Sequence, residues 1–162
     1  MILKNRKPTR KQGYDYSTPG YYFITTNVKD RLPWFGEIKN DQMVLNEYGA
    51  IASHLWEEIP HHFRDITLDE FIIMPDHVHG IIIIDAVGNN DRCSLQPSRN
   101  MELIPKIISQ YKSSVTRKIR ETYHDHEFQW QSSFHDRIIR DEPELGHIRQ
   151  YIWDNPKKTA SS

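Results

Sequence analysis

Residues 65–84, DITLDEFIIMPDHVHGIIII, decide the fold of this chain. Two runs rich in β-branched and apolar residues, 65–74 and 77–84, are separated only by Pro75-Asp76. A Pro-Asp step between two such runs is typical of a tight turn, so the segment predicts a β-hairpin. The second run ends in four successive isoleucines. Because side chains alternate between the faces of a strand, this run predicts a central strand that is covered on both faces.

Further regular elements are predicted on both sides of this hairpin, from period-2 or helical spacing of apolar residues. They are strands over 21–28 and 134–140 and helices over 41–58, 105–123 and 142–154. Asp41 is expected to cap the first helix and Pro60 to end it, whereas Pro156 is expected to end the last helix. Asp141 and Glu144 resemble a capping box at the start of that last helix.

The resulting order, β-α-β-β-α-β-α, predicts an α+β fold of the ferredoxin-like type, a sandwich whose antiparallel sheet has two helices on one face. The last helix is an addition to that core. RNA-recognition domains share the order but display aromatic residues on an open sheet, and a covered central strand argues against that use. We expect a basic arm over 1–18, one catalytic domain over 19–158, an exposed loop over 85–100 and a tail over 159–162.

The composition excludes several classes of protein. Lys and Arg number 21 against 22 Asp and Glu, so the net charge of −1 does not describe a polycation. A single cysteine, Cys93, excludes an internal disulfide and a zinc site built on cysteine pairs. No apolar run approaches the ~20 residues that span a bilayer, and the N-terminus lacks the apolar stretch of a secretory signal. A cytoplasmic setting is therefore expected.

Basic residues are nonetheless concentrated in two places, the N-terminal arm before Asp15 and the predicted helix over 105–123. A solvated tail and a solvated helix face would explain both concentrations. The alternative is a surface that follows a phosphate backbone. Charge alone does not choose between them.

His77 and His79 are the most informative pair of polar residues in the chain. Residues i and i+2 of a strand point to the same face, so two imidazoles at this spacing can converge on one cation. Gly80 follows and has no side chain, which indicates that something approaches closely there. The pair His124 and His126 has the same spacing but lies in a polar connector and is interpreted as surface, as are His61 and His62.

The last predicted helix carries a second row of polar residues. His147, Tyr151 and Asn155 follow one another at intervals of four, on one face of the helix. Taken alone, Tyr151 would be a packing residue and Asn155, before a proline, a cap. His147 is a candidate for supporting whatever site the other two form.

Four ordered motifs together identify a family. MPDHVHGIII (74–83), YKSSVTRKI (111–119), WQSSFHDRIIRDE (130–142) and YIWDNP (151–156) resemble those of the REP-associated tyrosine transposases. These belong to the single-tyrosine HUH transposase superfamily. The resemblance runs from about residue 21 to 156, nearly the whole chain. It implies the same ferredoxin-like fold with a C-terminal helix that carries the catalytic tyrosine.

The resemblance also implies roles for individual residues. His77 and His79 would be ligands of Mg²⁺ or Mn²⁺, Tyr151 would be the nucleophile, and Asn155 would complete the metal site. Some relatives have Gln at that last position, and the shorter Asn requires a slightly closer helix. A phenol is a poor nucleophile at neutral pH unless it is deprotonated or placed beside a cation, which the implied ion would supply.

The implied reaction is the nicking and rejoining of DNA strands. Attack by Tyr151 would leave a 5′-phosphotyrosine and a free 3′-hydroxyl, and the ester would be kept for rejoining without ATP. The implied partner is single-stranded or hairpin DNA, since the backbone must bend into a recessed site, and both a monomer and a homodimer are compatible. The basic residues expected to contact DNA are Arg6, Arg10, Lys112, Arg117, Lys118 and Arg120.

Three other functions remain open on the sequence alone. A nucleotide hydrolase of the histidine-triad type would need a third histidine at position 81, which is Ile. A domesticated relative would bind hairpin DNA without cutting it. A ferredoxin-like RNA-binding domain would need no metal. The formation of a covalent adduct with single-stranded DNA in the presence of Mn²⁺ would separate the three from a transposase.

Overall fold

The computed structural model describes residues 18–86 and 103–160. Arg6, Arg10, nearly all of the predicted arm and most of the predicted loop over 85–100 lie outside these ranges. The strands are β1 (Gly20–Asn27), β2 (Gly36–Lys39), β3 (Gln42–Leu45), β4 (Ile66–Met74), β5 (His77–Ile84) and β6 (His135–Ile139). The helices are α1 (Glu47–Glu57), α2 (Ile59–His62), α3 (Leu103–Tyr123) and α4 (Glu142–Ala160), with a short 3-10 turn, η1 (Lys29–Arg31).

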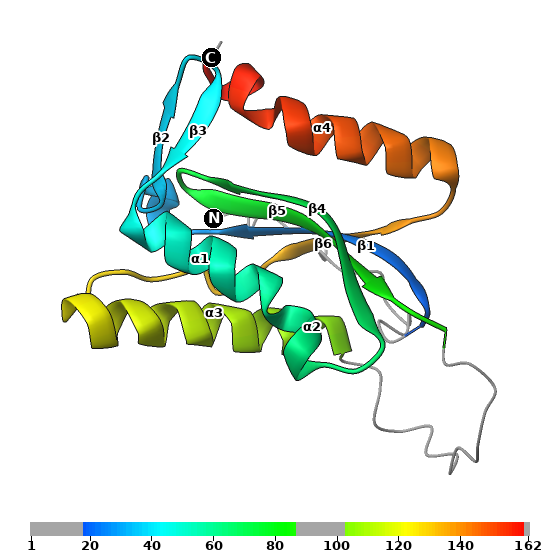
Figure 1. The fold of residues 1–162 in the computed structure, drawn as a ribbon, viewed down its shortest axis with the longest axis horizontal. Coiled ribbons are helices and arrows are strands. Elements are labelled where there is room, and N and C mark those ends of the chain that lie inside the picture. The colour runs from blue at the N-terminus through cyan, green and yellow to red at the C-terminus, as the bar shows by residue number, and fades with distance from the viewer. Residues whose placement is uncertain (1–17, 87–102, 161–162) are drawn as a thin grey trace, which may run out of the picture.

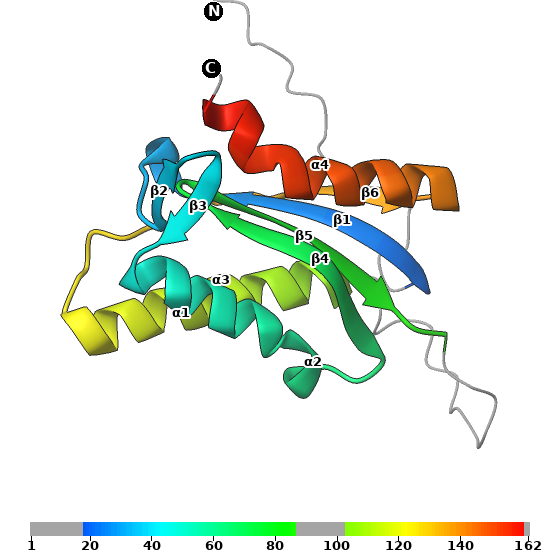
Figure 2. The ribbon, with the colours of Figure 1, turned by 45° about the horizontal axis from the view of Figure 1, so that its top comes forward.

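The main sheet has the strand order β4-β5-β1-β6, with every neighbouring pair antiparallel. Helices α1 and α3 cover one face and α4 covers the other (Figure 1). The same three layers are visible after a turn of the molecule (Figure 2). Counting only the strands of the main sheet, this order is that of a ferredoxin-like sandwich, so the predicted fold class is confirmed.

The hairpin predicted from residues 65–84 is also confirmed. Met74 pairs with His77, so only Pro75 and Asp76 connect β4 to β5. Both turn carbonyls accept backbone hydrogen bonds from a neighbouring segment, Pro75 from the N–H of Phe35 and Asp76 from the N–H of Val28. The turn is therefore fixed in place, and with it the beginning of β5.

A second hairpin, β2–β3, replaces the first part of the helix that was predicted over 41–58. Lys39 pairs with Gln42, and the two residues between them, Asn40 and Asp41, have φ of 50° and 60°. This left-handed conformation suits a two-residue hairpin turn and excludes Asp41 as a helix cap. The side chain of Asn46 caps α1 instead, by accepting from the N–H of Gly49 at 2.9 Å.

Of the two prolines that were expected to end helices, Pro60 follows a helix end, whereas Pro156 does not end its helix. Pro60 lies in the first turn of α2, after α1 has already ended at Glu57. Pro156 lies inside α4, which continues to Ala160. A proline inside a helix removes its own N–H from the ladder and crowds the carbonyl four residues earlier, so it disturbs a helix without always ending it. Just beyond Pro156, the hydroxyl of Thr159 donates to the carbonyl of Asn155 at 3.1 Å. The extension places Lys157 and Lys158 on the helix.

Two apolar cores lie on opposite faces of the sheet, as the isoleucine run predicts. Ile82 and Ile84 belong to the core under α1 and α3, whereas Ile81 packs with Leu145, Ile148 and Ile152 under α4. A Cβ added to Gly80 would lie 2.3 Å from Trp56 of α1. The close approach expected at this glycine is therefore an indole ring of the protein itself. Within the described ranges, no helix is long and apolar enough to cross a membrane.

Candidate active site

His77 and His79 occupy the beginning of β5 on the face covered by α4. Their side chains are almost fully buried, with residue exposures of 7% and 6%. The two Nε2 atoms face each other at 3.1 Å. The predicted convergence of the two imidazoles is thus observed. By contrast, His124 and His126 are exposed in their connector, as the sequence predicts.

The outer nitrogen of each imidazole has a partner of its own. The Nδ1 of His77 lies 2.5 Å from the carboxylate of Asp76, and the Nδ1 of His79 lies 2.7 Å from the hydroxyl of Thr25. Partners at Nδ1 orient an imidazole and leave Nε2 for a ligand, which is the usual arrangement of metal-binding histidines. Burial, together with the charges of His77 and Arg31, lowers the pKa of His79 to about 3. His79 is therefore neutral at physiological pH, as a metal ligand must be.

Tyr151 of α4 lies against this histidine pair. Its ring centroid is 5.4 Å from that of His79 and 6.1 Å from that of Phe23 of β1, both in edge-to-face geometry. Tyr151 is nevertheless 39% exposed, so a substrate can reach it from solvent. The ammonium of Lys158 sits 4.9 Å from the centroid of the same ring. Asn155, one turn beyond Tyr151, is buried at 5% exposure.

The predicted metal ligands fit a divalent cation by the chemistry of their donor atoms. Bonds of about 2.0–2.1 Å from one ion reach two imidazole nitrogens that are 3.1 Å apart. Asn155 supplies a buried amide oxygen on the helix that covers the pair. Among the described residues, no group of three or more His, Cys, Asp or Glu forms a metal site. The ligand set that the resemblance implies, two imidazoles and an amide, stays a prediction.

Two contacts that the sequence analysis missed hold α4 on the sheet. β4 has a register shift between Leu68 and Phe71, and the irregular residues Asp69 and Glu70 bond to the helix. Arg149 donates from Nε to Asp69 at 2.8 Å, and the indole of Trp153 donates to Glu70 at 2.8 Å. These two residues of α4 lie on either side of Tyr151 in sequence. The acidic pair inside an otherwise apolar strand, DITLDEFIIM, was the available signal.

A further residue missed by the sequence analysis, Arg31 of η1, lies beside the histidine pair. Its Nε is 2.8 Å from Asp76, and its Nη1 donates to the side-chain oxygen of Asn27 at 2.6 Å. Its Nη2 is 3.5 Å from the Nδ1 of His77. No periodic pattern distinguishes Arg31 in the segment NVKDRLP, because its position depends on the turn that follows β1.

The predicted DNA-contacting residues of α3 lie on the opposite face of the sheet. Arg117, Lys118 and Arg120 are exposed, and the first and last of these line a shallow groove of about 410 Å³ beside Trp130. Lys112 also lines it, but its ammonium donates to the backbone carbonyls of Gln131, at 2.5 Å, and of Ser133, at 3.2 Å. Burial lowers the pKa of Lys112 to about 8. Lys112 therefore already has a structural role.

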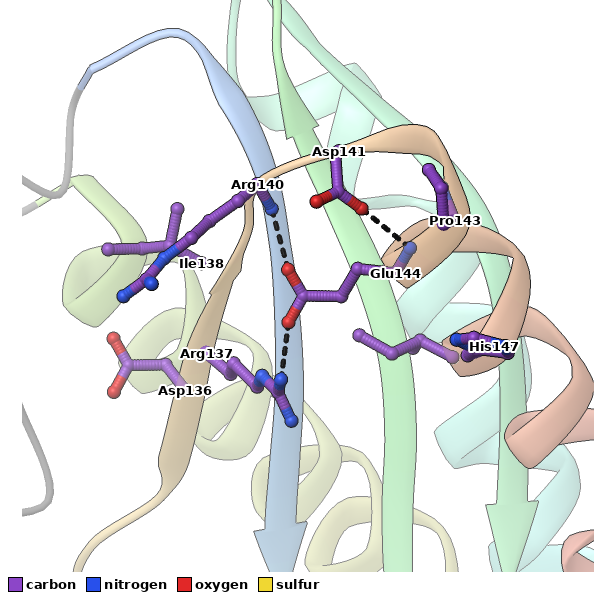
Figure 3. A pocket seen from close by; sticks show the side chains of 9 residues that line it. Asp136, Arg137, Ile138, Arg140, Asp141, Pro143, Glu144 and His147 are labelled. Atoms are coloured by element: carbon purple, nitrogen blue, oxygen red, sulfur yellow. Dashed lines mark hydrogen bonds and ion pairs between the residues drawn. The ribbon is translucent and has the colours of Figure 1, made fainter.

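His147 lines a different cavity, a cleft of about 770 Å³ between β6 and the first turns of α4 (Figure 3). In this cleft Glu144 pairs with Arg137 at 2.5 Å and accepts from the N–H of Arg140 at 2.8 Å. The predicted capping interaction is present, since Asp141 accepts from the N–H of Glu144 at 2.8 Å. The supporting role expected for His147 stays a prediction.

Comparisons with known proteins agree with the motifs. The chain matches no family model. An uncharacterized protein of Haemophilus influenzae is 36% identical over 162 residues, which span 95% of this chain and 89% of the relative. Another protein of that organism, provisionally named a REP-associated tyrosine transposase, is 26% identical over 148 residues, 89% of this chain and 74% of the relative.

A solved structure of a REP-associated tyrosine transposase bound to a REP hairpin superimposes with a TM-score of 0.62. The match has 18% identity and covers 93% of this chain and 74% of the other. In sequence and in fold, the chain is similar to REP-associated tyrosine transposases. A crystal structure of a provisionally named transposase from Deinococcus radiodurans has the same fold, with a TM-score of 0.51 and 18% identity, over 88% of this chain and 95% of that one.

These comparisons confirm the resemblance that the four motifs indicate. The HxH pair lies at the start of a central strand, and the tyrosine of YIWDNP lies on the helix that covers it. His79 and Tyr151, 72 positions apart in the sequence, therefore meet at one end of the sheet. The roles of the individual residues stay predictions.

Proposed function

We propose that this protein nicks and rejoins single-stranded DNA at hairpin or repeat sequences, in a transposase-like reaction that uses a 5′-phosphotyrosine intermediate. Tyr151 is the nucleophile, and His77, His79 and Asn155 hold Mg²⁺ or Mn²⁺. The observation that carries the proposal is the position of a half-exposed tyrosine ring 5.4 Å from one of two buried imidazoles whose Nε2 atoms face each other.

The proposed chemistry requires a small number of bond changes. The phenolic oxygen of Tyr151 forms a bond to phosphorus, the bond from phosphorus to the 3′ oxygen breaks, and that oxygen takes up a proton as the phenol loses one. The divalent ion, when bound, would offset the negative charge that develops on the phosphate. Attack by the freed 3′-hydroxyl reverses the step and rejoins a strand.

Neighbouring side chains hold the two imidazoles and Tyr151 in fixed positions. The carboxylate of Asp76 and the hydroxyl of Thr25 fix the two imidazoles through Nδ1. The contacts of Arg149 and Trp153 with the irregular part of β4 fix the rotation of α4 around its axis, and hence the direction of Tyr151. Such fixed geometry supplies much of the rate of a displacement at phosphorus.

The proposed DNA partner is supported by the charged surface of α3 and by a relative that was solved with a REP hairpin. Arg117, Lys118 and Arg120 are exposed cations on one helix, as required for phosphate contacts along a stem. The segment around Gln131 connects this surface to the site, because its carbonyl bonds to Lys112 and its side chain accepts from Asn27 of β1 at 3.2 Å.

The experiment that tests this proposal is the formation of a covalent adduct. Hairpin oligonucleotides taken from the DNA that flanks the gene are incubated with the protein and Mn²⁺ and resolved on a denaturing gel. We expect an adduct with the parent protein and none with Tyr151→Phe, which deletes the nucleophile but little volume. Tyr123→Phe is the matched control, since Tyr123 is 38% exposed against 39% for Tyr151 and lies on α3.

Each outcome has a distinct meaning. An adduct that persists in Tyr151→Phe would contradict Tyr151 as the nucleophile. Loss of the adduct in Tyr123→Phe would assign that role to Tyr123. Tyr111 is excluded as a substitute, because it is buried and its hydroxyl donates to the carbonyl of Ala52 at 3.0 Å. Hairpin binding by the parent protein with no adduct at all would favour the alternative, a domesticated protein that binds hairpin DNA without cutting.

A further inference from the structure

We propose that Arg31 binds a phosphate of the DNA strand next to the histidine pair, so that it contacts the substrate directly. The inference rests on the proposed function, because it assigns a substrate contact within the same site. It adds a residue from the turn after β1 to a site otherwise built from β5 and α4.

Two side chains accept hydrogen bonds from the Arg31 guanidinium, which also lies beside His77. Asp76 accepts from Nε at 2.8 Å, Asn27 accepts from Nη1 at 2.6 Å, and Nη2 lies 3.5 Å from His77. Asn27 pairs with His77 across β1 and β5, so its side chain points to the face that α4 covers. The guanidinium is therefore held on the same face as the two imidazoles.

The guanidinium has donors to spare and access to solvent. Arginine has five N–H donors in a rigid planar group, and the bonds to Asp76 and Asn27 use two of them. The side chain is 52% exposed even though Asp76 beside it is 21% exposed. A planar cation with free donors, fixed at the mouth of a site, suits the oxygens of a phosphodiester.

The backbone at this turn adopts a conformation that ordinary residues rarely take. Asp30 and Arg31 have φ of 57° and 56°, both in the left-handed region. The turn is tied down on each side, since Arg31 donates from its N–H to Val28, and Val28 forms an isolated bridge with Trp130. Strained residues of this kind persist where the surrounding structure imposes them and are frequent at functional sites.

The alternative role of Arg31 is purely structural, as the partner of Asp76 that keeps His77 oriented. The two roles predict different measurements. A phosphate contact contributes to the salt dependence of DNA binding, whereas a structural role acts through the metal ligands and the fold.

The first measurement is binding of a 30-nucleotide poly-dT strand without divalent metal, at several salt concentrations. For single strands each phosphate contact contributes about 0.7 to the slope of log affinity against log salt. We expect Arg31→Ala to lower the slope by about 0.7 and Arg31→Lys to restore it. Asn27→Ala is the matched control, because it removes one bond to the guanidinium and leaves the charge in place.

The second measurement combines adduct formation with Mn²⁺ binding followed by electron paramagnetic resonance. Loss of a hydrogen bond between charged groups predicts an adduct rate lower by about ten- to a hundredfold in Arg31→Ala. Arg31→Lys should recover part of this loss, since it restores the charge but not the planar group. Mn²⁺ binding and the denaturation midpoint should remain those of the parent.

The inference is overturned if Arg31→Ala keeps both the parent salt slope and the parent adduct rate. It is also overturned if Arg31→Ala loses Mn²⁺ binding in proportion to the adduct, since Arg31 would then act through His77. If Arg31→Ala does not fold, Arg31→Lys decides by its salt slope and rate. Absence of any adduct in the parent protein contradicts the proposed function, whereas the salt slope still decides whether Arg31 contacts DNA.

Discussion

The two faces of the sheet differ in how they are covered. On the face closed by α1 and α3, twenty buried residues form one continuous apolar core within the described part of the chain. Under α4, five such residues form the core, and Thr25, His77, His79 and Asn155 lie beyond it. One face is therefore covered by a large apolar core, and the other has a smaller core with a cluster of polar residues at one end.

This difference shows how a small sandwich makes room for a site. A single helix covers only part of a four-stranded face, so polar groups at one end can remain reachable. The cost is a smaller apolar contact, and the bonds of Arg149 and Trp153 to Asp69 and Glu70 compensate for it. The helix that carries Tyr151, the proposed nucleophile, is therefore positioned by a few specific polar contacts as well as by apolar packing.

Substitution of adjacent isoleucines on β5 is expected to give the largest effect, and it compares the apolar cores on the two faces of the sheet. Ile82 and Ile81 are both fully buried but belong to opposite cores. Substitution of a buried Ile by Ala costs about 2–5 kcal/mol of unfolding free energy, depending on how far the site can relax. We expect Ile82→Ala near the upper end and Ile81→Ala near the lower end, measured by urea denaturation. Equal losses would contradict the view that the smaller apolar core under α4 contributes less to stability.

The bond between Arg149 and Asp69 provides a second, smaller test. Asp69→Asn keeps the shape but removes the charge, and we expect it to lower the unfolding free energy by about 1 kcal/mol, since Arg149 is partly exposed and solvent screens the pair. The adduct rate should also fall, because Tyr151 would be less firmly positioned. Asp154→Asn is the control: Asp154 pairs with Lys157 inside α4 and does not reach the sheet.

The same pair predicts a dependence on acid. The hydrogen bond from Arg149 lowers the pKa of Asp69 below its usual 3.8. The unfolded chain therefore binds this proton at a higher pH than the folded chain, and the contribution to stability is complete above the unfolded pKa. It is lost as the pH falls through the lower, folded pKa. Asp69→Asn should remove this part of the acid dependence in denaturation curves below pH 4, and an unchanged profile would contradict the assignment.

The smallest expected effect concerns the cations of α3. Arg117→Ala should lower the salt slope for binding of a hairpin stem by about one, similarly for different sequences. Lys112→Ala should instead lower the thermal unfolding temperature and leave the slope unchanged, because its ammonium already bonds to two backbone carbonyls. A slope that falls equally in both variants would assign Lys112 to the DNA surface. A slope that falls in neither variant would show that these cations of α3 do not contact DNA.

Local patterns predicted the elements that make up the main sheet. The bounds of β5 agree exactly with the predicted 77–84, because a Pro-Asp turn and an apolar run define both ends. The β2–β3 hairpin was missed, since apolar spacing over 41–58 is compatible with a helix and the left-handed turn at Asn40 and Asp41 has no glycine to indicate it. The end of α4 was missed because Pro156, which is buried, lies inside a helix that continues to Ala160.

The sequence by itself determined the ferredoxin-like order, the common face of His77 and His79, and the row of Tyr151 and Asn155 on one helix, since all three depend on spacing along the chain. Only the tertiary structure decided which face α4 covers, that the ring of Tyr151 meets that of His79, and that Arg31 lies beside His77. Spacing fixes the direction of a side chain relative to its own strand or helix. Contacts between elements depend on loops, bulges and turns, such as the irregular part of β4 and the turn after β1, whose geometry no periodic pattern records.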